Sequence, residues 1–92
     1  MSKTLVKIEN WSVVEDLNSE NYRGLQPGSH LMGYVFGHVN LPNAKFIYTS
    51  RIMRVDADEG FVETLNTVYQ LGEANTEYKR WDWKRRAAAA VA

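Results

Sequence analysis

The stretch Lys45-Phe-Ile-Tyr-Thr-Ser-Arg-Ile-Met-Arg-Val55, with its continuation to Leu71, decides the fold that we predict for this 92-residue chain. The first arm is dense in β-branched and aromatic residues, which favour strands. Asp56-Ala-Asp-Glu-Gly60 then forms a polar loop, whose closing glycine can adopt the positive φ that ends many longer hairpin turns. We therefore predict one long β-hairpin over residues 45–71. Alternation along the return arm places four large apolar side chains on its core face: Phe61, Leu65, Tyr69 and Leu71.

Two further strands are predicted before this hairpin. Apolar and charged residues alternate at the start of the chain, which indicates a strand over about residues 4–9. Residues 30–38 form a strand pattern with large side chains on both faces, which is typical of a central or curled strand. Gly33 and Gly37 within it favour a bulge or a sharp bend. Residues 15–28 lack apolar periodicity and indicate a single helical turn or an irregular crossover.

A C-terminal helix is predicted over about residues 76–88. Asn75 or Thr76 can cap its first N–H groups, and Glu77 lies in the first turn, where the helix dipole favours an acid. The chain is predicted to form a single domain over residues 1–92. Its predicted class is α+β, with a small, strongly bent antiparallel sheet or open barrel and the C-terminal helix packed on one face.

The composition is that of a folded protein. Hydrophobic residues make up 45% of the chain and the net charge is zero, which excludes the usual signature of disorder. The absence of cysteine excludes disulfides and thiolate metal sites. No stretch approaches the roughly 20 apolar residues of a membrane span, and the N-terminus has no signal-peptide core. We therefore expect a cytoplasmic protein with no membrane partner.

The zero net charge hides an asymmetry. Residues 1–75 carry six basic and nine acidic side chains, a net charge of −3, whereas residues 76–92 carry five and two, a net charge of +3. A neutral total gives no general attraction to nucleic acid, but the basic end favours a local contact or an attraction between the two halves.

The predicted helix has aromatic residues on two sides. At 100° per residue Tyr78 and Trp81 share one side, while Trp83 points about 140 to 160° away from them. We predict that Tyr78 and Trp81 face the core and that Trp83 lies at or near the surface. A tryptophan among basic residues can stack a nucleobase or anchor a protein interface. Equally, it can lie along the domain under an arginine stem. The candidate partner-binding residues of the helix are Lys79, Arg80, Trp83, Lys84 and Arg86.

The loop of the predicted hairpin supplies a second candidate contact, formed by Asp56, Asp58 and Glu59. These acids lack the ligand spacing and flanking helices of a calcium loop, so no metal is predicted there. On the outgoing arm Arg51 and Arg54 fall on opposite faces, and a cross-strand pairing with Glu63 or another acid would account for one of them.

No catalytic site is predicted. His30 and His38 have no partners at metal-ligand spacing, and the hydroxyls of Thr49 and Ser50 belong to no Ser/His/Asp order. We therefore expect no cofactor and no enzymatic activity.

The chain from Trp11 to Tyr78 resembles a group of small, mostly uncharacterised bacterial and phage or prophage proteins. The stretches that carry the resemblance are Trp11-Ser-Val-Val14, Gly33-Tyr-Val-Phe-Gly-His38, Thr49-Ser-Arg-Ile52, Thr64-Leu-Asn-Thr-Val-Tyr-Gln-Leu-Gly72 and Glu77-Tyr78. The resemblance implies a context, because small phage proteins without catalytic motifs are frequently accessory factors that block a host complex. Inhibitors of CRISPR surveillance complexes are among them.

Together these features predict a small phage- or prophage-derived, non-enzymatic binding protein. The first hypothesis is an anti-CRISPR-type inhibitor that occupies the surface of a host defence complex, either a protein or a ribonucleoprotein. The alternative is a weak nucleic-acid-binding module that uses the same helix. The sequence does not decide the oligomeric state.

Overall fold

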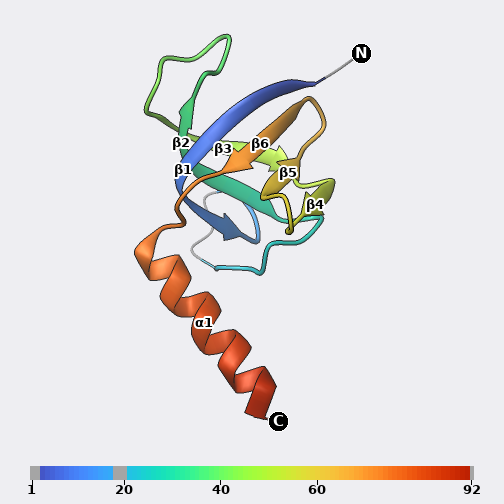
Figure 1. Cartoon of the computed structure of the whole chain (residues 1–92), viewed down its shortest axis with the longest axis vertical. Helices are drawn as coiled ribbons and strands as arrows, with labels where there is room; N and C mark the ends of the chain where they lie inside the picture. The colour runs from blue at the N-terminus through green and yellow to red at the C-terminus, as the bar shows by residue number, and fades with distance from the viewer. Residues whose placement is uncertain (1–2, 18–20, 92) are drawn as a thin grey trace.

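The computed structural model describes residues 3–17 and 21–91. Over these residues six strands form one sheet, and a single helix follows them (Figure 1). The elements are β1 Thr4–Val14, β2 His30–Phe36, β3 Lys45–Arg51, β4 Arg54–Asp56, β5 Phe61–Glu63, β6 Thr67–Leu71 and α1 Thr76–Val91. The order across the sheet is β3-β2-β1-β6-β5-β4. The predicted α+β class is confirmed.

The sheet is mixed, so the predicted antiparallel sheet is confirmed only in part. β1 and β6 pair in parallel, with Leu5 opposite Val68, whereas the other strand pairs are antiparallel. The parallel pair arises because β6 reaches β1 from the far side of the sheet, through β4 and β5. Two short reversals along that path bring the chain back to the direction of β1.

The prediction of one long hairpin over residues 45–71 is wrong, because these residues do not form a single hairpin. β3 pairs with β2 and β4 pairs with β5, so the two halves of the predicted outgoing arm lie at opposite edges of the sheet. The switch occurs at Ile52 and Met53. The Ile52 N–H donates to the Ser29 carbonyl at 2.7 Å, whereas the Met53 N–H donates to the Glu63 carbonyl at 2.8 Å. Only β4 and β5 form the predicted hairpin, and Gly60 has the expected positive φ of 74°.

This connection requires the sheet to curl. In a flat sheet the edge strands β3 and β4 would lie five strand spacings apart, about 24 Å. The chain between Arg51 and Arg54 reaches only about 10 Å. The two edges must therefore approach each other around Ile52, and yet β3 and β4 do not pair, so the sheet stays open.

A turn between β5 and β6 shifts the alternation of the return arm, so the predicted faces are wrong before the turn and correct after it. The Thr64 N–H donates to the Thr67 carbonyl at 2.9 Å, which ends β5 and restarts the alternation in β6. Val62 and Thr64 are consequently buried before the turn and Tyr69 after it. Leu65, predicted for the core face, lies at the turn and is 63% exposed.

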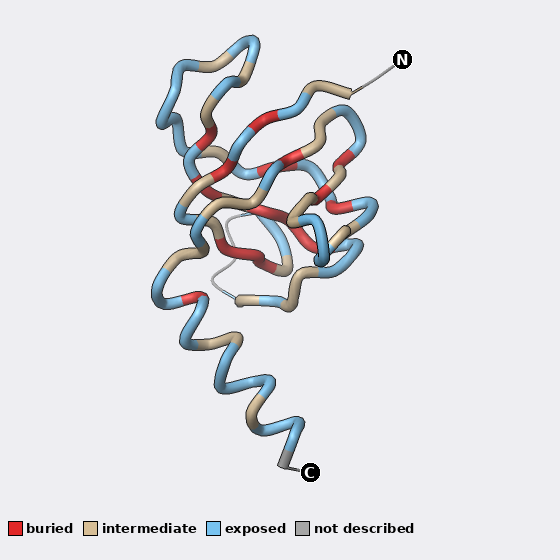
Figure 2. Tube along the Cα trace, viewed as in Figure 1, coloured by how far each residue is buried: buried red, intermediate tan, exposed pale blue. Residues whose placement is uncertain are grey.

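β1 is longer than predicted and contains a bulge. Its pairing with β2 shifts register between Glu9 and Ser12, and Asn10 has a positive φ of 51°. Gly33 of β2 packs against this bulge, where a Cβ atom would lie 2.9 Å from the Glu9 carbonyl oxygen. The predicted link between a strand glycine and a bulge is confirmed at this position. Figure 2 shows the buried residues concentrated along the strands of the sheet.

The helix begins where the sequence predicts and runs to Val91. The Asn75 side-chain oxygen accepts the N–H groups of Glu77 at 2.9 Å and Tyr78 at 3.2 Å, which confirms Asn75 as the N-cap. α1 docks beside the end of β1 instead of lying along a face of the sheet, because Tyr78 and Trp81, the large side chains that dock it, lie in its first two turns. Figure 1 shows the remainder projecting away from the sheet. The segment before β2 contains no helix in the described residues 15–17 and 21–28, and residues 18–20 lie outside the described part.

Candidate interaction site

The docked side of α1 is an aromatic cluster. Tyr78 is 2% exposed, and its ring packs 5.6 Å from the Trp11 ring and 5.6 Å from the Trp81 ring. Tyr22 makes edge-to-face contacts with both helix rings. The Tyr78 hydroxyl donates to the Arg23 carbonyl at 2.5 Å, and burial raises the pKa of this phenol. This cluster sets the rotation of the helix about its axis.

That rotation directs Trp83 into solvent. Its side chain is 70% exposed, the value expected for a residue opposite Tyr78 and Trp81. The predicted division of the three rings between a docked and an exposed side is confirmed.

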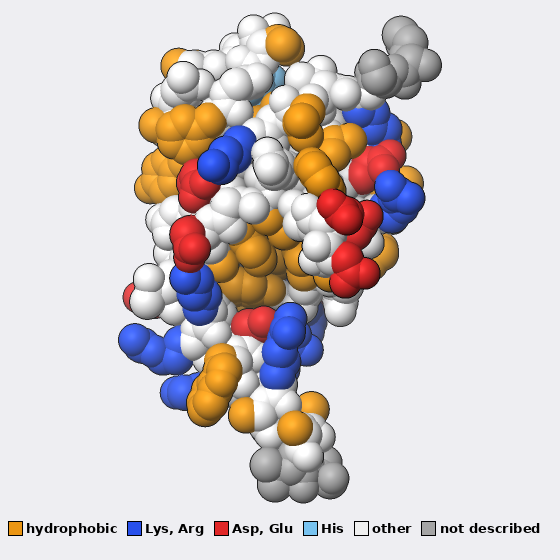
Figure 3. Space-filling view, viewed as in Figure 1, with side chains coloured by type: hydrophobic (Ala, Val, Ile, Leu, Met, Phe, Trp, Pro, Cys, Tyr) orange, Lys and Arg blue, Asp and Glu red, His pale blue; other side chains and the backbone are white. Residues whose placement is uncertain are grey.

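Intramolecular ion pairs divide the basic residues of the helix. Lys79 pairs with Glu73 at 2.5 Å, and Arg86 pairs with Asp82 at 3.0 Å. Arg85, which also binds Asp82, lies over the Trp81 ring at 5.3 Å. Across residues 3–17 and 21–91, Arg80 and Lys84 have no ion-pair partner. We call Arg80, Trp83 and Lys84 the outer helix face. Figure 3 shows basic side chains gathered around α1 where it leaves the sheet.

The acidic candidates lie on the turn between β4 and β5. The Asp56 carboxylate accepts the Glu59 N–H at 3.1 Å, and the Gly60 N–H donates to the Asp56 carbonyl at 2.9 Å. These bonds hold the turn closed while Asp58 and Glu59 point outward as exposed side chains.

The structure does not bring the two sets of candidates together. Among the strands it describes, α1 contacts β1 alone, whereas β4 and β5 lie at an edge of the sheet. Figure 1 shows the helix leaving the body away from the β4–β5 hairpin. A partner would therefore have to be large, or contact one of the two surfaces only.

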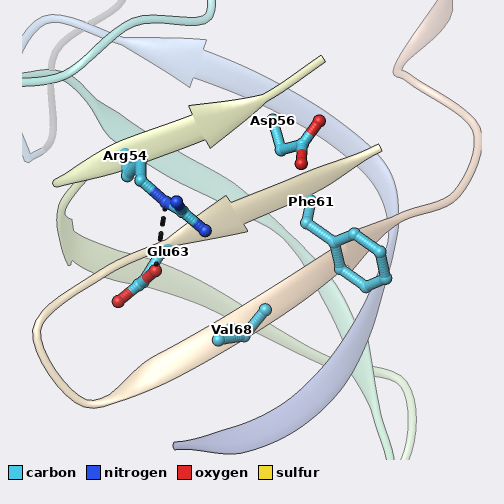
Figure 4. Close-up of a pocket in the computed structure, with 5 residues that line it drawn as sticks. All are labelled: Arg54, Asp56, Phe61, Glu63 and Val68. Carbon is cyan, nitrogen blue, oxygen red and sulfur yellow. Dashed lines mark ion pairs between the residues drawn. The ribbon is translucent and has the colours of Figure 1, made fainter. Parts of the chain in front are cut away.

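A pocket that was not predicted from the sequence lies beside the acidic turn. It has a volume of about 240 Å³ and lies on the outer side of the β4–β5–β6 unit (Figure 4). Its lining residues are Arg54, Asp56, Phe61, Glu63 and Val68. Arg54 pairs with Glu63 at 3.4 Å in register, so Arg54 is the one of the two arm arginines that makes a cross-strand pair, whereas Arg51 lies 3.6 Å from Asp16. The alternation of residues 54–63 was the available signal, but it needed the correct strand pairing to be interpreted.

A second missed feature is an exposed aromatic row on β2 and β3. Phe46 packs edge-to-face on Tyr34 at 5.2 Å and on Tyr48 at 5.5 Å, and all three rings are exposed. β3 has a neighbour on one side only. This row gives the outer surface of the edge strand an apolar character.

The remaining polar candidates have structural partners. His30 is buried with its Nδ1 atom 2.9 Å from the Thr49 carbonyl oxygen, and His38 Nδ1 accepts the Asn40 N–H at 3.0 Å. The Thr49 hydroxyl donates to the Ser50 carbonyl at 2.7 Å. Within the described residues no group of three or more His, Cys, Asp or Glu side chains could hold a metal ion. Within the described residues, no helix is long and apolar enough to cross a membrane.

Lys3 controls the ionisation of Glu63 at the edge of the pocket. Lys3 Nζ donates to the Glu63 carboxylate at 2.5 Å, and this bond lowers the pKa of Glu63 despite the opposing effect of burial. A carboxyl with a lowered pKa in the folded state stabilises the fold above its unfolded pKa, and this contribution disappears as the pH falls through the folded pKa.

We expect Lys3→Ala to raise the pKa of Glu63 and to destabilise the protein most at neutral pH. The difference in unfolding free energy from the wild type should shrink as the pH falls below about 4, where the carboxyl is protonated in both states. Urea unfolding between pH 7 and pH 3, with NMR titration of the Glu63 carboxyl carbon, measures both effects. Lys84→Ala is the control. A difference that stays constant across this range would contradict the role assigned to Lys3.

Comparison with protein families, curated proteins and solved structures finds no match to this chain. The resemblance to phage and prophage proteins therefore stays a prediction. The candidate site is therefore defined by its geometry alone. It is a helix face beyond a curled sheet, where Trp83 lies with Arg80 and Lys84, two basic residues without ion-pair partners among the described residues.

Proposed function

We propose that the protein acts by binding a macromolecular partner through the outer helix face, without catalysing a reaction. The exposure of Trp83 carries this proposal. An isolated protein gains nothing by holding a large indole ring in water, whereas tryptophan and arginine are enriched among the residues that dominate interfaces. Arg80 and Lys84 flank the ring, and within the described residues the ion pairs of the helix involve Lys79, Arg85 and Arg86 instead of these two.

The partner surface that fits this face is acidic around an apolar depression. The indole ring would fill the depression, and the two bases would pair with acids at its rim. Because α1 projects from the sheet, the ring can enter a concave surface without the body of the protein interfering.

We propose a host defence complex as that partner, and an anti-CRISPR-type inhibition in which the bound protein blocks the complex in the host cytoplasm. The support is the resemblance to phage and prophage proteins, combined with a face suited to protein contacts. The complex could be a protein or a ribonucleoprotein, since both can offer a protein surface to the outer helix face.

A nucleic-acid-binding module is the second candidate, and one observation favours it. The exposed Trp83 ring can stack on a nucleobase while the basic side chains of Arg80 and Lys84 contact phosphates. Two phosphate contacts would give a logarithmic salt slope of about −1.8 on B-DNA, so binding would weaken measurably with salt. Salt dependence therefore distinguishes this candidate from a contact dominated by Trp83.

The test compares the wild type with variants of the outer helix face for binding to purified CRISPR surveillance complexes. We expect the wild type to bind one of these complexes and to reduce its association with target DNA. Trp83→Ala should weaken the binding about 30-fold or more, the effect of losing an interface hot spot. Arg80→Ala should weaken it less, because a rim charge chiefly changes the association rate.

Leu65→Ala is the matched control, since Leu65 is also an exposed large apolar residue but lies in the turn between β5 and β6, two strands that α1 does not contact. Binding that survives Trp83→Ala unchanged would remove the outer helix face as the site. Absence of binding to every complex in the panel would overturn the proposed partner, and salt-sensitive binding to DNA or RNA alone would favour the second candidate.

A further inference from the structure

The pocket on the β4–β5–β6 unit has two chemically different ends. Figure 4 shows Arg54 directed toward Glu63 at one end, and Asp56 near the Phe61 ring at the other. Val68, which lies opposite Glu63 on β6, adds an apolar side chain to the lining. The pocket therefore offers an aromatic ring and carboxylates on a partly apolar surface.

The cations of the chain occupy one end only. Glu63 is bound by Lys3 at 2.5 Å and by Arg54 at 3.4 Å, so its charge is neutralised within the protein. Asp56 accepts one backbone N–H, from Glu59, and has no ion-pair partner in residues 3–17 and 21–91. A backbone N–H leaves most of the acceptor sites of a carboxylate unused, because an ionised carboxylate can accept about four hydrogen bonds.

We infer that this pocket binds the guanidinium group of an arginine side chain on a partner protein. The guanidinium would lie against the Phe61 ring and donate two hydrogen bonds to the Asp56 carboxylate. Planar stacking and bidentate pairing with one carboxylate are both properties of arginine, whereas a lysine ammonium is a compact, strongly hydrated charge. The acids Asp58 and Glu59 on the adjoining turn add attraction for a cation and repel an anionic ligand.

This site is independent of the proposed function, because it uses neither the residues nor the sign of charge of the outer helix face. The helix would place the basic side chains of Arg80 and Lys84 against an acidic surface, whereas the pocket would place the Asp56 carboxylate against an arginine of the partner. A partner that carries an exposed arginine could use the pocket even if the outer helix face has no role.

The experiment is an NMR titration of the isotope-labelled protein with the peptide acetyl-Gly-Arg-Gly-amide. We expect saturable shifts of the Phe61 ring resonances and of the backbone amides over residues 54–63. The matching peptide with lysine in place of arginine should bind several-fold more weakly, and the peptide with glutamate should not bind. Shifts confined to α1, or equal affinity for the lysine and arginine peptides, would overturn the inference.

Two variants test the two contacts separately. Asp56→Asn keeps an oxygen that can accept the Glu59 N–H, so the turn should form, but loss of the charge should weaken the arginine peptide about tenfold. Phe61→Leu keeps an apolar wall and removes the aromatic face, which should weaken binding about two- to fivefold. Asp58→Asn removes the same charge from the same turn but lies outside the pocket lining, so as the control it should weaken binding far less than Asp56→Asn does. Wild-type affinity in Asp56→Asn would contradict the assignment.

Discussion

Tyr78→Ala should lower the free energy of unfolding by about 3–5 kcal/mol, the usual cost of truncating a buried aromatic residue. The Tyr78 ring is 2% exposed and contacts the rings of Trp11, Tyr22 and Trp81, so its removal leaves a cavity at the base of α1. Without this ring the helix should also lose its fixed position beside β1. Urea unfolding measures the first effect, and amide hydrogen exchange over residues 76–83 measures the second.

Tyr78→Phe separates the ring from its hydroxyl. It should cost about 1–3 kcal/mol, because the Arg23 carbonyl would lose the hydrogen bond that the hydroxyl donates. Trp83→Ala is the matched control on the same helix and should leave stability almost unchanged, since the ring is 70% exposed. If both alanine variants had the same stability, the assignment of the docked and outer sides of α1 would be wrong.

Ile52→Ala is expected to lower the free energy of unfolding by about 2–5 kcal/mol. Ile52 is 1% exposed and belongs to the core cluster. It is also the residue at which the chain passes from one edge of the sheet to the other. A cavity there removes contacts where the curled sheet brings its two edges together, so the effect should exceed that of trimming a residue held by one strand pair.

The neighbouring residue is the control for this prediction. Met53 is 58% exposed, and Met53→Ala should change stability by no more than about 0.5 kcal/mol. Both variants can be compared by urea unfolding with a common slope. If both alanine variants lost the same free energy of unfolding, the packing assigned to Ile52 between the two edges of the sheet would be wrong.

Part of the candidate site could be predicted from the sequence because it depends on one helix. The rotation of an α-helix relates Tyr78, Trp81 and Trp83 through a fixed angle, so burying the first two exposes the third. Asn75 could be predicted as the cap because its side chain acts on N–H groups only two and three residues away.

The division of the basic residues was settled by the structure, although part of it has a local signal. Lys79 binds Glu73 from the loop before the helix, while Asp82 binds Arg85 and Arg86 at the i,i+3 and i,i+4 spacings of helix ion pairs. The sequence prediction treated Lys79, Arg80, Lys84 and Arg86 as equivalent candidates. The pocket was missed for a related reason, since its five lining residues come together only through the pairing of three separate strands.

The stretch from Lys45 to Leu71 marks the boundary between these two kinds of information. Its sequence by itself determined that the chain is extended there and that Gly60 closes a turn, because strand propensity and the positive φ of glycine are local properties. Only the tertiary structure decided which strands pair, because hydrogen bonding along a backbone has the same chemistry for every partner. Burial of Ile52 between the two edges, together with the Thr64 turn that reverses the alternation, selected a curled mixed sheet over a simple hairpin.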